Sequence, residues 1–115
     1  NLPLTIFGDG TQQRDVLYVG DLCKLIYKEI TTKEMWGKVY NVGGGKKNVV
    51  SLREVMKIIE SISKKKYEKV SYKDVRLGDQ KTYISDLTDL EPYWKPQVSM
   101  KEGFKKAYSW LYKNL

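Results

Sequence analysis

The sequence predicts an α/β fold with a small mixed sheet and about four helices. Segments rich in β-branched and aromatic residues, which favour strands, alternate along the chain with segments whose apolar residues recur at helical spacing. Two Ser-x-x-Glu motifs, at 51–54 and 99–102, mark helix starts, because both side chains of such a motif satisfy free backbone N–H groups. At 115 residues, the chain fits one domain with a modest core.

The first third of the chain predicts two extended segments and a helix. Residues 4–7 and 15–19 are rich in strand-forming residues. Asp21 is expected to cap the helix that follows, and Cys23 to lie in its apolar pattern as a small core residue. Apolar residues at helical spacing give this helix one buried face: Leu22, Leu25, Ile26 and Ile30.

The middle of the chain predicts a strand, a glycine loop and a helix. Residues 38–42 form the strand, which the triplet 43–45 ends. The three glycines lack the spacing of a dinucleotide-binding loop, so we expect a flexible or tightly turned loop. The helix after Ser51 carries an apolar stripe that ends near Ser63.

The last part of the chain predicts two short extended segments and two helices. Residues 69–72 and 82–84 are extended, with a loop between them. Residues 86–89 open a short helix that Pro92 terminates. The closing helix follows Ser99. Its apolar face contains Phe104, Ala107, Tyr108 and Leu111.

Composition excludes several classes of function for these residues. The sequence contains neither a bilayer-spanning apolar run nor a signal-peptide pattern. One cysteine and no histidine exclude an internal disulfide, a Cys/His zinc site and a Ser-His-Asp or Cys-His catalytic system. A single cysteine fits a reducing compartment, so we expect a cytoplasmic protein. The chain begins without methionine in a strand-forming region, and we expect a fragment of a longer protein.

The net charge of +7 comes mostly from scattered lysines. The run at 64–66 can be a solvated helix end that complements the helix dipole, or a nucleic-acid patch. The helix end is favoured, because nucleic-acid readers usually depend on arginine, and only Arg14, Arg53 and Arg76 are present. The positive field would still attract an anionic small molecule.

Two arginines in predicted loops indicate a diphosphate site. Arg14 and Arg76 each offer a planar fork of donors that matches phosphate oxygens, and Asp79 can accept from paired sugar hydroxyls. Local ion pairing is the alternative, which spacing alone favours because surface ion pairs are common. It would join Arg14 to Asp9 or Asp15, and Arg76 to Asp74 or Asp79.

Four stretches resemble, in order, the motifs of one enzyme family. They read Phe-Gly-Asp-Gly-Thr-Gln-Gln-Arg-Asp-Val-Leu-Tyr-Val-Gly-Asp-Leu at 7–22, Val-Tyr-Asn-Val-Gly-Gly at 39–44, Arg-Leu-Gly-Asp-Gln at 76–80, and Trp-Lys-Pro-Gln-Val-Ser at 94–99. Together they resemble the extended short-chain dehydrogenase/reductase family, which includes nucleotide-sugar epimerases and 4,6-dehydratases. Asn48 ahead of 51–52, with 78–81, is most similar to the CDP-tyvelose (CDP-paratose) 2-epimerases. UDP-glucose 4-epimerase and dTDP-glucose 4,6-dehydratase carry similar motifs.

The resemblance implies the C-terminal part of an NAD(P)-binding, Rossmann-type enzyme. Residues 1–115 would be a single fragment, the substrate-binding lobe, with 15–43 as the last strand-helix unit of the Rossmann lobe. NAD and the catalytic Tyr-x-x-x-Lys pair would belong to the N-terminal part of such an enzyme, outside this chain. The chain alone is therefore expected to be inactive, with no catalytic residue, metal ligand or bound cofactor of its own.

The resemblance also implies a nucleotide-diphospho-sugar partner and roles for single residues. Arg14 and Arg76 would contact the substrate diphosphate and Asp79 its ribose. The backbone edge of residues 5–7 would meet the base, with Phe7 as the main contact. Two further candidates are Tyr83, near the sugar pocket, and Asn41.

Partners of other kinds follow from the composition and charge, and from the layout of the family. We expect no nucleic acid and no membrane. A helix and strand without the rest of the Rossmann lobe would expose apolar faces and an unpaired edge, which predicts a homodimer or self-association of the fragment. The rival hypotheses are another activity of the same family, a non-catalytic nucleotide-diphosphate module and a basic nucleic-acid-binding module.

Overall fold

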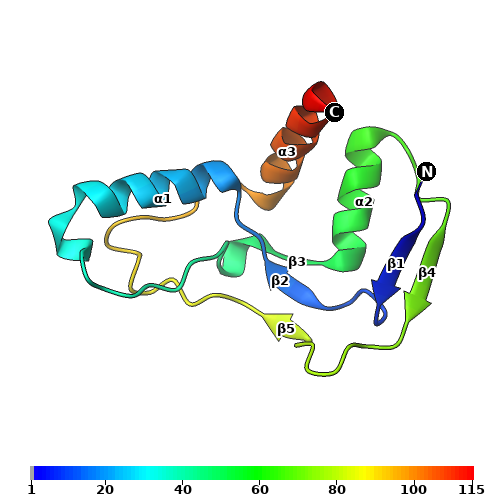
Figure 1. Ribbon diagram of the computed structural model, residues 1–115, viewed down its shortest axis with the longest axis horizontal. Helices are drawn as coiled ribbons and strands as arrows, with labels where there is room; N and C mark the ends of the chain where they lie inside the picture. Colours follow the sequence, from blue (N-terminus) through cyan, green and yellow to red (C-terminus); the bar gives the residue numbers. More distant parts are fainter. Residues whose placement is uncertain (1) are drawn as a thin grey trace.

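Short strands join distant parts of the sequence in the computed structural model, which describes residues 2–115 (Figure 1). One sheet pairs β1 (Leu4–Phe7) with β4 (Val70–Lys73) in parallel. The other has the order β3-β2-β5, with β2 (Gln13–Asp15) antiparallel to β3 (Val49–Ser51) and parallel to β5 (Thr82–Tyr83). The predicted α/β class is confirmed, although the described residues form two small sheets rather than one.

The described residues contain three α-helices: α1 (Val19–Thr31), α2 (Leu52–Ser63) and α3 (Met100–Asn114). In Figure 1, α2 and α3 stand side by side above the β3-β2-β5 sheet, and α1 extends away to the opposite end of the molecule. The helix predicted after Ser51 is confirmed, with its end at Ser63.

The two predicted capping motifs differ in the structure. At the start of α2, Ser51 Oγ accepts from the Glu54 N–H at 3.2 Å, and the Glu54 carboxylate accepts from the Ser51 N–H at 2.8 Å. These bonds from Ser51, the backbone one first, lower the pKa of Glu54. At the start of α3, Ser99 accepts from the Glu102 N–H, but the Glu102 carboxylate pairs with Lys106 at 2.9 Å instead of returning to the cap. The second capping box is therefore only half formed.

The predicted fourth helix does not form. Residues 88–93 make successive turns instead. The Asp86 carboxylate accepts from the N–H and hydroxyl of Thr88, which stabilises a local turn. Pro92 has no N–H to continue a helical ladder.

Two predicted extended segments are also wrong in their boundaries or class. The extended segment predicted at 15–19 pairs only at its first residue, because β2 ends at Asp15 and α1 begins at Val19. Residues 38–42 are not a strand, since none of the described strands pairs with them. A segment forms a β-strand only if a neighbouring strand pairs with it, and the segment's own sequence does not show whether such a neighbour exists.

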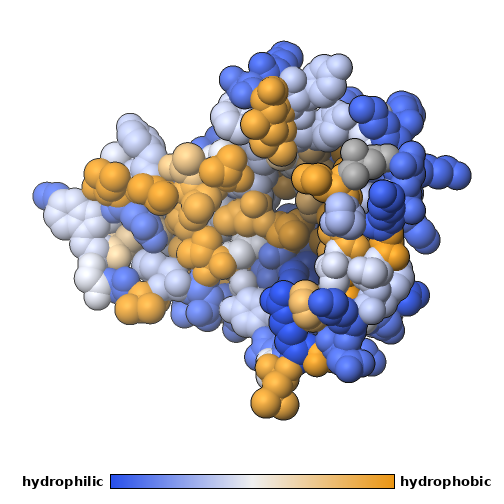
Figure 2. Space-filling view, turned by 45° about the vertical axis from the view of Figure 1, so that its right-hand side comes forward, coloured by the Kyte–Doolittle hydropathy of each residue, from blue (hydrophilic) through white to orange (hydrophobic). Residues whose placement is uncertain are grey.

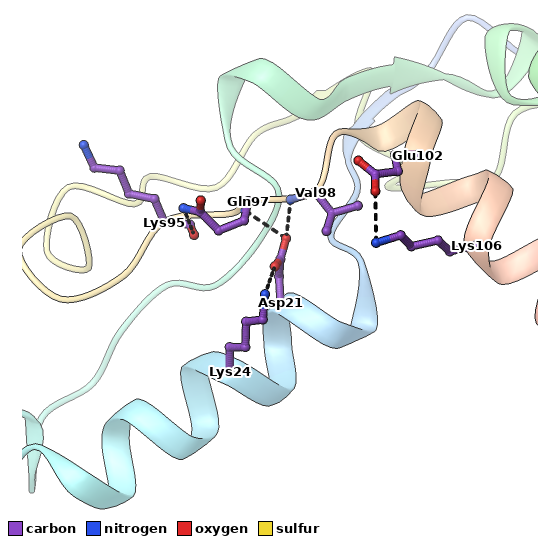
Figure 3. Close-up of polar contacts among 7 residues, drawn as sticks. All are labelled: Asp21, Lys24, Lys95, Gln97, Val98, Glu102 and Lys106. Atoms are coloured by element: carbon purple, nitrogen blue, oxygen red, sulfur yellow. Dashed lines mark hydrogen bonds and ion pairs between the residues drawn. The ribbon is translucent and has the colours of Figure 1, made fainter.

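Asp21 ties α1 to the far end of the chain rather than capping it. Tyr18 occupies the N-cap position, and the Asp21 carboxylate is fully buried in the first turn. This carboxylate accepts from the backbone N–H groups of Gln97 at 2.9 Å and Val98 at 2.8 Å (Figure 3). The predicted cap is wrong because two distant donors hold the side chain away from the helix start.

The core lies between α1 and the turns that follow β5. Leu25, Met35, Leu90 and Trp94 are buried together, with Leu17, Tyr40, Leu87 and Tyr93 packed against them. The predicted buried face of α1 is correct only for Leu25. Of the other members, Leu22 is 37%, Ile26 48% and Ile30 66% exposed, and Cys23 is exposed as well. Figure 2 shows hydrophobic side chains gathered on the surface at the α1 end.

The apolar face predicted for α3 is only partly covered. Phe104 and Tyr108 are half-buried, whereas Ala107 and Leu111 are exposed. Within residues 2–115, no helix has both the length and the apolar character needed to cross a membrane.

Candidate functional site

Five of the six predicted site residues lie on adjoining elements, and we call them the arginine cluster. Phe7 ends β1, Arg14 lies in β2, Tyr83 in β5, and the other two in the loop between β4 and β5. The cluster consists of Phe7, Arg14, Arg76, Asp79 and Tyr83. Asn41 lies in the unpaired segment 38–42, and no hydrogen bond among the described residues joins it to the cluster.

The backbone brings the cluster together from both sides. Arg14 faces Tyr83 in the parallel register of β2 and β5. In the preceding loop, the Asp79 N–H donates to the Arg76 carbonyl at 3.1 Å, which turns the chain back toward β2. Gly78 takes φ +82° in this turn, a conformation that favours glycine.

Arg14 is held by a residue far away in the sequence. Its Nη2 donates to Asp79 Oδ1 at 2.7 Å, and its Nη1 donates to the Gln13 carbonyl at 2.7 Å. Both side chains of the ion pair are partly exposed. The charges of Arg14, Arg76 and Asp79 sum to +1 if each is ionised (two cations and one anion), so the cluster can attract an anion.

The local partners considered for Arg14 are engaged elsewhere. Asp9 Oδ1 accepts from the Thr11 hydroxyl at 2.6 Å and N–H at 2.9 Å, and these bonds lower the pKa of Asp9. The Asp15 carboxylate accepts from the N–H groups of Gly45 at 2.9 Å and Ser85 at 3.1 Å. Adjacent strand residues point to opposite faces, which separates Asp15 from the cluster.

Arg76 stacks on an aromatic ring instead of pairing with a carboxylate. Its guanidinium carbon lies 3.9 Å from the centre of the Phe7 ring, a cation–π contact. Neither predicted ion pair of Arg76, with Asp74 or with Asp79, is formed among the described residues.

Asp15 and Asn48 make contacts between segments that were not predicted from the sequence. Asp15 ties β2 to the glycine loop and to the segment after β5, as described above. Asn48 donates from Nδ2 to the Gly44 carbonyl at 3.0 Å and accepts from the Met100 N–H at 2.9 Å. Only their positions in the sequence could have indicated these residues, since Asp15 follows Arg14 directly and Asn48 comes shortly after the glycine triplet.

The glycine loop does not fit a dinucleotide. A Cβ on Gly43 would lie 2.2 Å from Ser85 Oγ, and one on Gly44 would lie 1.9 Å from the Val16 carbonyl oxygen. The chain itself occupies the space that a dinucleotide-binding glycine keeps open for a pyrophosphate. The predicted tightly turned loop is therefore closely packed at Gly43 and Gly44.

Known proteins share both sequence and fold with this chain. Residues 1–43 match the family described as "NAD dependent epimerase/dehydratase family". UDP-glucuronate 4-epimerase of Thermodesulfobacterium geofontis is 31% identical over 115 residues, covering 98% of this chain and 34% of the relative. CDP-paratose 2-epimerase of Salmonella typhi is 33% identical over 113 residues, covering 96% of this chain and 33% of the relative.

A solved structure matches almost the whole chain. The UDP-glucuronic acid 4-epimerase of Bacillus cereus, in complex with UDP-glucuronic acid and NAD, superposes with a TM-score of 0.85 at 29% identity. The match covers 98% of this chain and 36% of the epimerase. This chain therefore spans about a third of the length of the relatives it matches. Residues 2–115 therefore have the α/β fold that makes up about a third of this NAD-bound extended short-chain dehydrogenase/reductase structure.

Proposed function

We propose that the chain is the nucleotide-diphospho-sugar binding part of an NAD-dependent nucleotide-sugar epimerase or dehydratase. The observation that carries this proposal is the arginine cluster, in which Arg14 pairs with Asp79 while Arg76, in the same turn as Asp79, lies over the ring of Phe7. Relatives of this chain act on UDP- and CDP-linked sugars, as their names state. In this assignment residues 15–43 belong to the Rossmann lobe, and NAD and the catalytic pair lie outside the chain.

Each group of the cluster suits one part of the substrate. Arg14 and Arg76 present planar donors to the two phosphates, and Asp79 accepts from the ribose hydroxyls. β1 pairs on one edge only, with β4, so backbone groups on its other edge can meet the base. We assign the sugar contact to Tyr83, which faces Arg14 in the register of β2 and β5.

Within this class, we propose a 2-epimerase acting on a CDP-linked sugar, because the motifs at 48–52 and 78–81 resemble that group. The alternatives are a 4-epimerase and a 4,6-dehydratase. Product analysis by NMR distinguishes them in the complete protein. Inversion at sugar carbon 2 supports the first, inversion at carbon 4 the second, and loss of water the third. A cytoplasmic location stays a prediction.

Ligand binding by the complete protein tests the proposed function. We expect CDP-, UDP- or dTDP-linked sugars to bind at micromolar concentrations, and single-stranded RNA to bind weakly. Isothermal titration with each ligand at two salt concentrations compares the affinities for nucleotide sugars and for RNA, and the salt dependence of each. Tight RNA binding with a steep salt dependence, and no nucleotide binding, would contradict the proposal and favour a nucleic-acid-binding module.

We further propose that the 115-residue chain by itself self-associates with a second copy. The exposed apolar residues of α1 and the unpaired segment 38–42 offer a contact surface and a free backbone edge. Sedimentation velocity is expected to show dimers or larger species, increasing at high salt because salt screens the repulsion of the +7 charge.

A matched pair of variants locates the contact. Ile26→Glu with Ile30→Glu is expected to shift the chain toward monomer, because charges would then lie on the contact surface. Val75→Glu with Leu77→Glu makes the same change at two exposed residues of the loop between β4 and β5 and should leave association unchanged. A clean monomer of the unmodified chain at high concentration would rule the proposal out.

A further inference from the structure

We propose that Phe7 is a positioning residue that acts through Arg76. Its ring holds the guanidinium at the diphosphate site, and its side chain affects anion binding rather than touching the nucleotide base. This inference rests on the proposed function, in which Arg76 binds the substrate diphosphate. It changes the role first expected for Phe7, because the face of its ring near the loop is already covered by Arg76.

Arg76 has little else to hold it. Residues 74–81 are all exposed, and within the loop 76–79 the Asp79 N–H to Arg76 carbonyl bond closes the turn. The Arg76 side chain makes no ion pair among the described residues. A free arginine side chain samples many rotamers, so an aromatic face that fixes the guanidinium reduces the ordering needed on binding.

Phe7, by contrast, is held firmly. It pairs with Lys73 in the parallel β1–β4 register, and the next residue, Gly8, donates its N–H to the Lys73 carbonyl at 2.9 Å. The Phe7 carbonyl accepts from Gln12 Nε2 at 2.9 Å. The loop then passes close above Gly8, where a Cβ would lie 3.2 Å from Val75 Cγ2. A paired strand end therefore carries the ring that meets the exposed Arg76.

The two arginines of the cluster are held in different ways. Arg14 forms an ion pair with the carboxylate of Asp79. Arg76 rests on an uncharged ring, and no carboxylate of residues 2–115 forms an ion pair with it. A guanidinium that stacks through its face keeps its in-plane N–H donors free for an anion. Phe7 thus orients Arg76 without competing for those donors, whereas a carboxylate in its place would compete.

The test uses the complete protein and inorganic pyrophosphate, a probe that has no base. Phe7→Leu keeps an apolar side chain but removes the aromatic face, and we expect about fivefold weaker pyrophosphate binding, the size of an exposed cation–π contact. Phe7→Tyr keeps the face and should restore the affinity. Arg76→Lys leaves β1 unchanged and should also weaken binding.

A double-mutant cycle separates positioning from a structural effect. In an Arg76→Ala background, Phe7→Leu should have no further effect on pyrophosphate affinity. A loss that persists in that background, a failure of Phe7→Tyr to restore binding, or an unchanged affinity of Phe7→Leu would each overturn the inference. If the unmodified protein binds neither pyrophosphate nor any nucleotide sugar, the proposed function fails, and the inference with it.

Discussion

Replacing Arg14 with alanine is expected to weaken nucleotide-sugar binding by the complete protein about 10- to 100-fold. A hydrogen bond to a charged group contributes about 1.5 to 3 kcal/mol, and the loss corresponds to one such contact. The change also leaves Asp79 without its cation, so a bare carboxylate would face the phosphates. Isothermal titration measures the nucleotide-sugar affinity, and a separate NAD titration should show no change.

Arg53→Ala is the matched control for Arg14→Ala. It removes the same charge, but Arg53 donates through Nε to the Asp9 carbonyl and lies outside the arginine cluster. We expect it to change the affinity by less than about threefold, because Arg53 bonds to Asp9 and Gly10 rather than to the cluster, and its charge would act through a screened field. Equal losses in both variants would indicate a general electrostatic effect and would argue against a specific role of Arg14.

Gly44→Ala is expected to destabilise the protein by about 3 kcal/mol or more. A Cβ at this position would meet backbone and a short side chain, 1.9 Å from the Val16 carbonyl oxygen and 2.8 Å from Asn48 Cβ. Neither neighbour can move freely, because the Val16 N–H donates to the Asn48 carbonyl at 3.0 Å. Overpacking against such atoms displaces the backbone and belongs to the severe class of substitutions.

Gly37→Ala provides the comparison for Gly44→Ala. Gly37 has φ +70° and no atom within 4 Å of a built Cβ, so only backbone strain opposes the substitution. We expect the free energy of unfolding to fall by about 1 kcal/mol, as for other residues that carry a side chain in the left-handed region. Urea and thermal unfolding of both variants measure which substitution lowers the free energy of unfolding more. A Gly44→Ala protein as stable as Gly37→Ala would show that the glycine loop can move away from β2.

Interactions between near neighbours in the sequence were predicted well. The capping box of α2 uses Ser51 and Glu54, and both its bonds are present. The strand at 4–7 also forms as expected, although its partner β4 lies far away in the sequence. The loop at 76–79 depends on local residue types and forms as well. Such features need few distant partners, so a short window of sequence contains most of the information that decides them.

Predictions that depended on distant partners failed or were incomplete. Asp21 was expected as a cap, yet its carboxylate binds the backbone of Gln97 and Val98. The pairing of Arg14 with Asp79 joins residues 65 positions apart, and spacing suggested nearer aspartates instead. Residues 38–42 have the composition of a strand but no strand beside them.

The sequence alone determined the α/β class and the start and end of α2, and it supplied the residues proposed for the site, because its motifs and residue types are visible in the printed order. Only the tertiary structure decided that Arg14 pairs with Asp79, that Arg76 rests on Phe7, and that much of the α1 stripe is exposed. The physical reason is that side-chain partners and burial depend on which distant segments meet. That outcome is set by packing over the whole chain and not by any one segment.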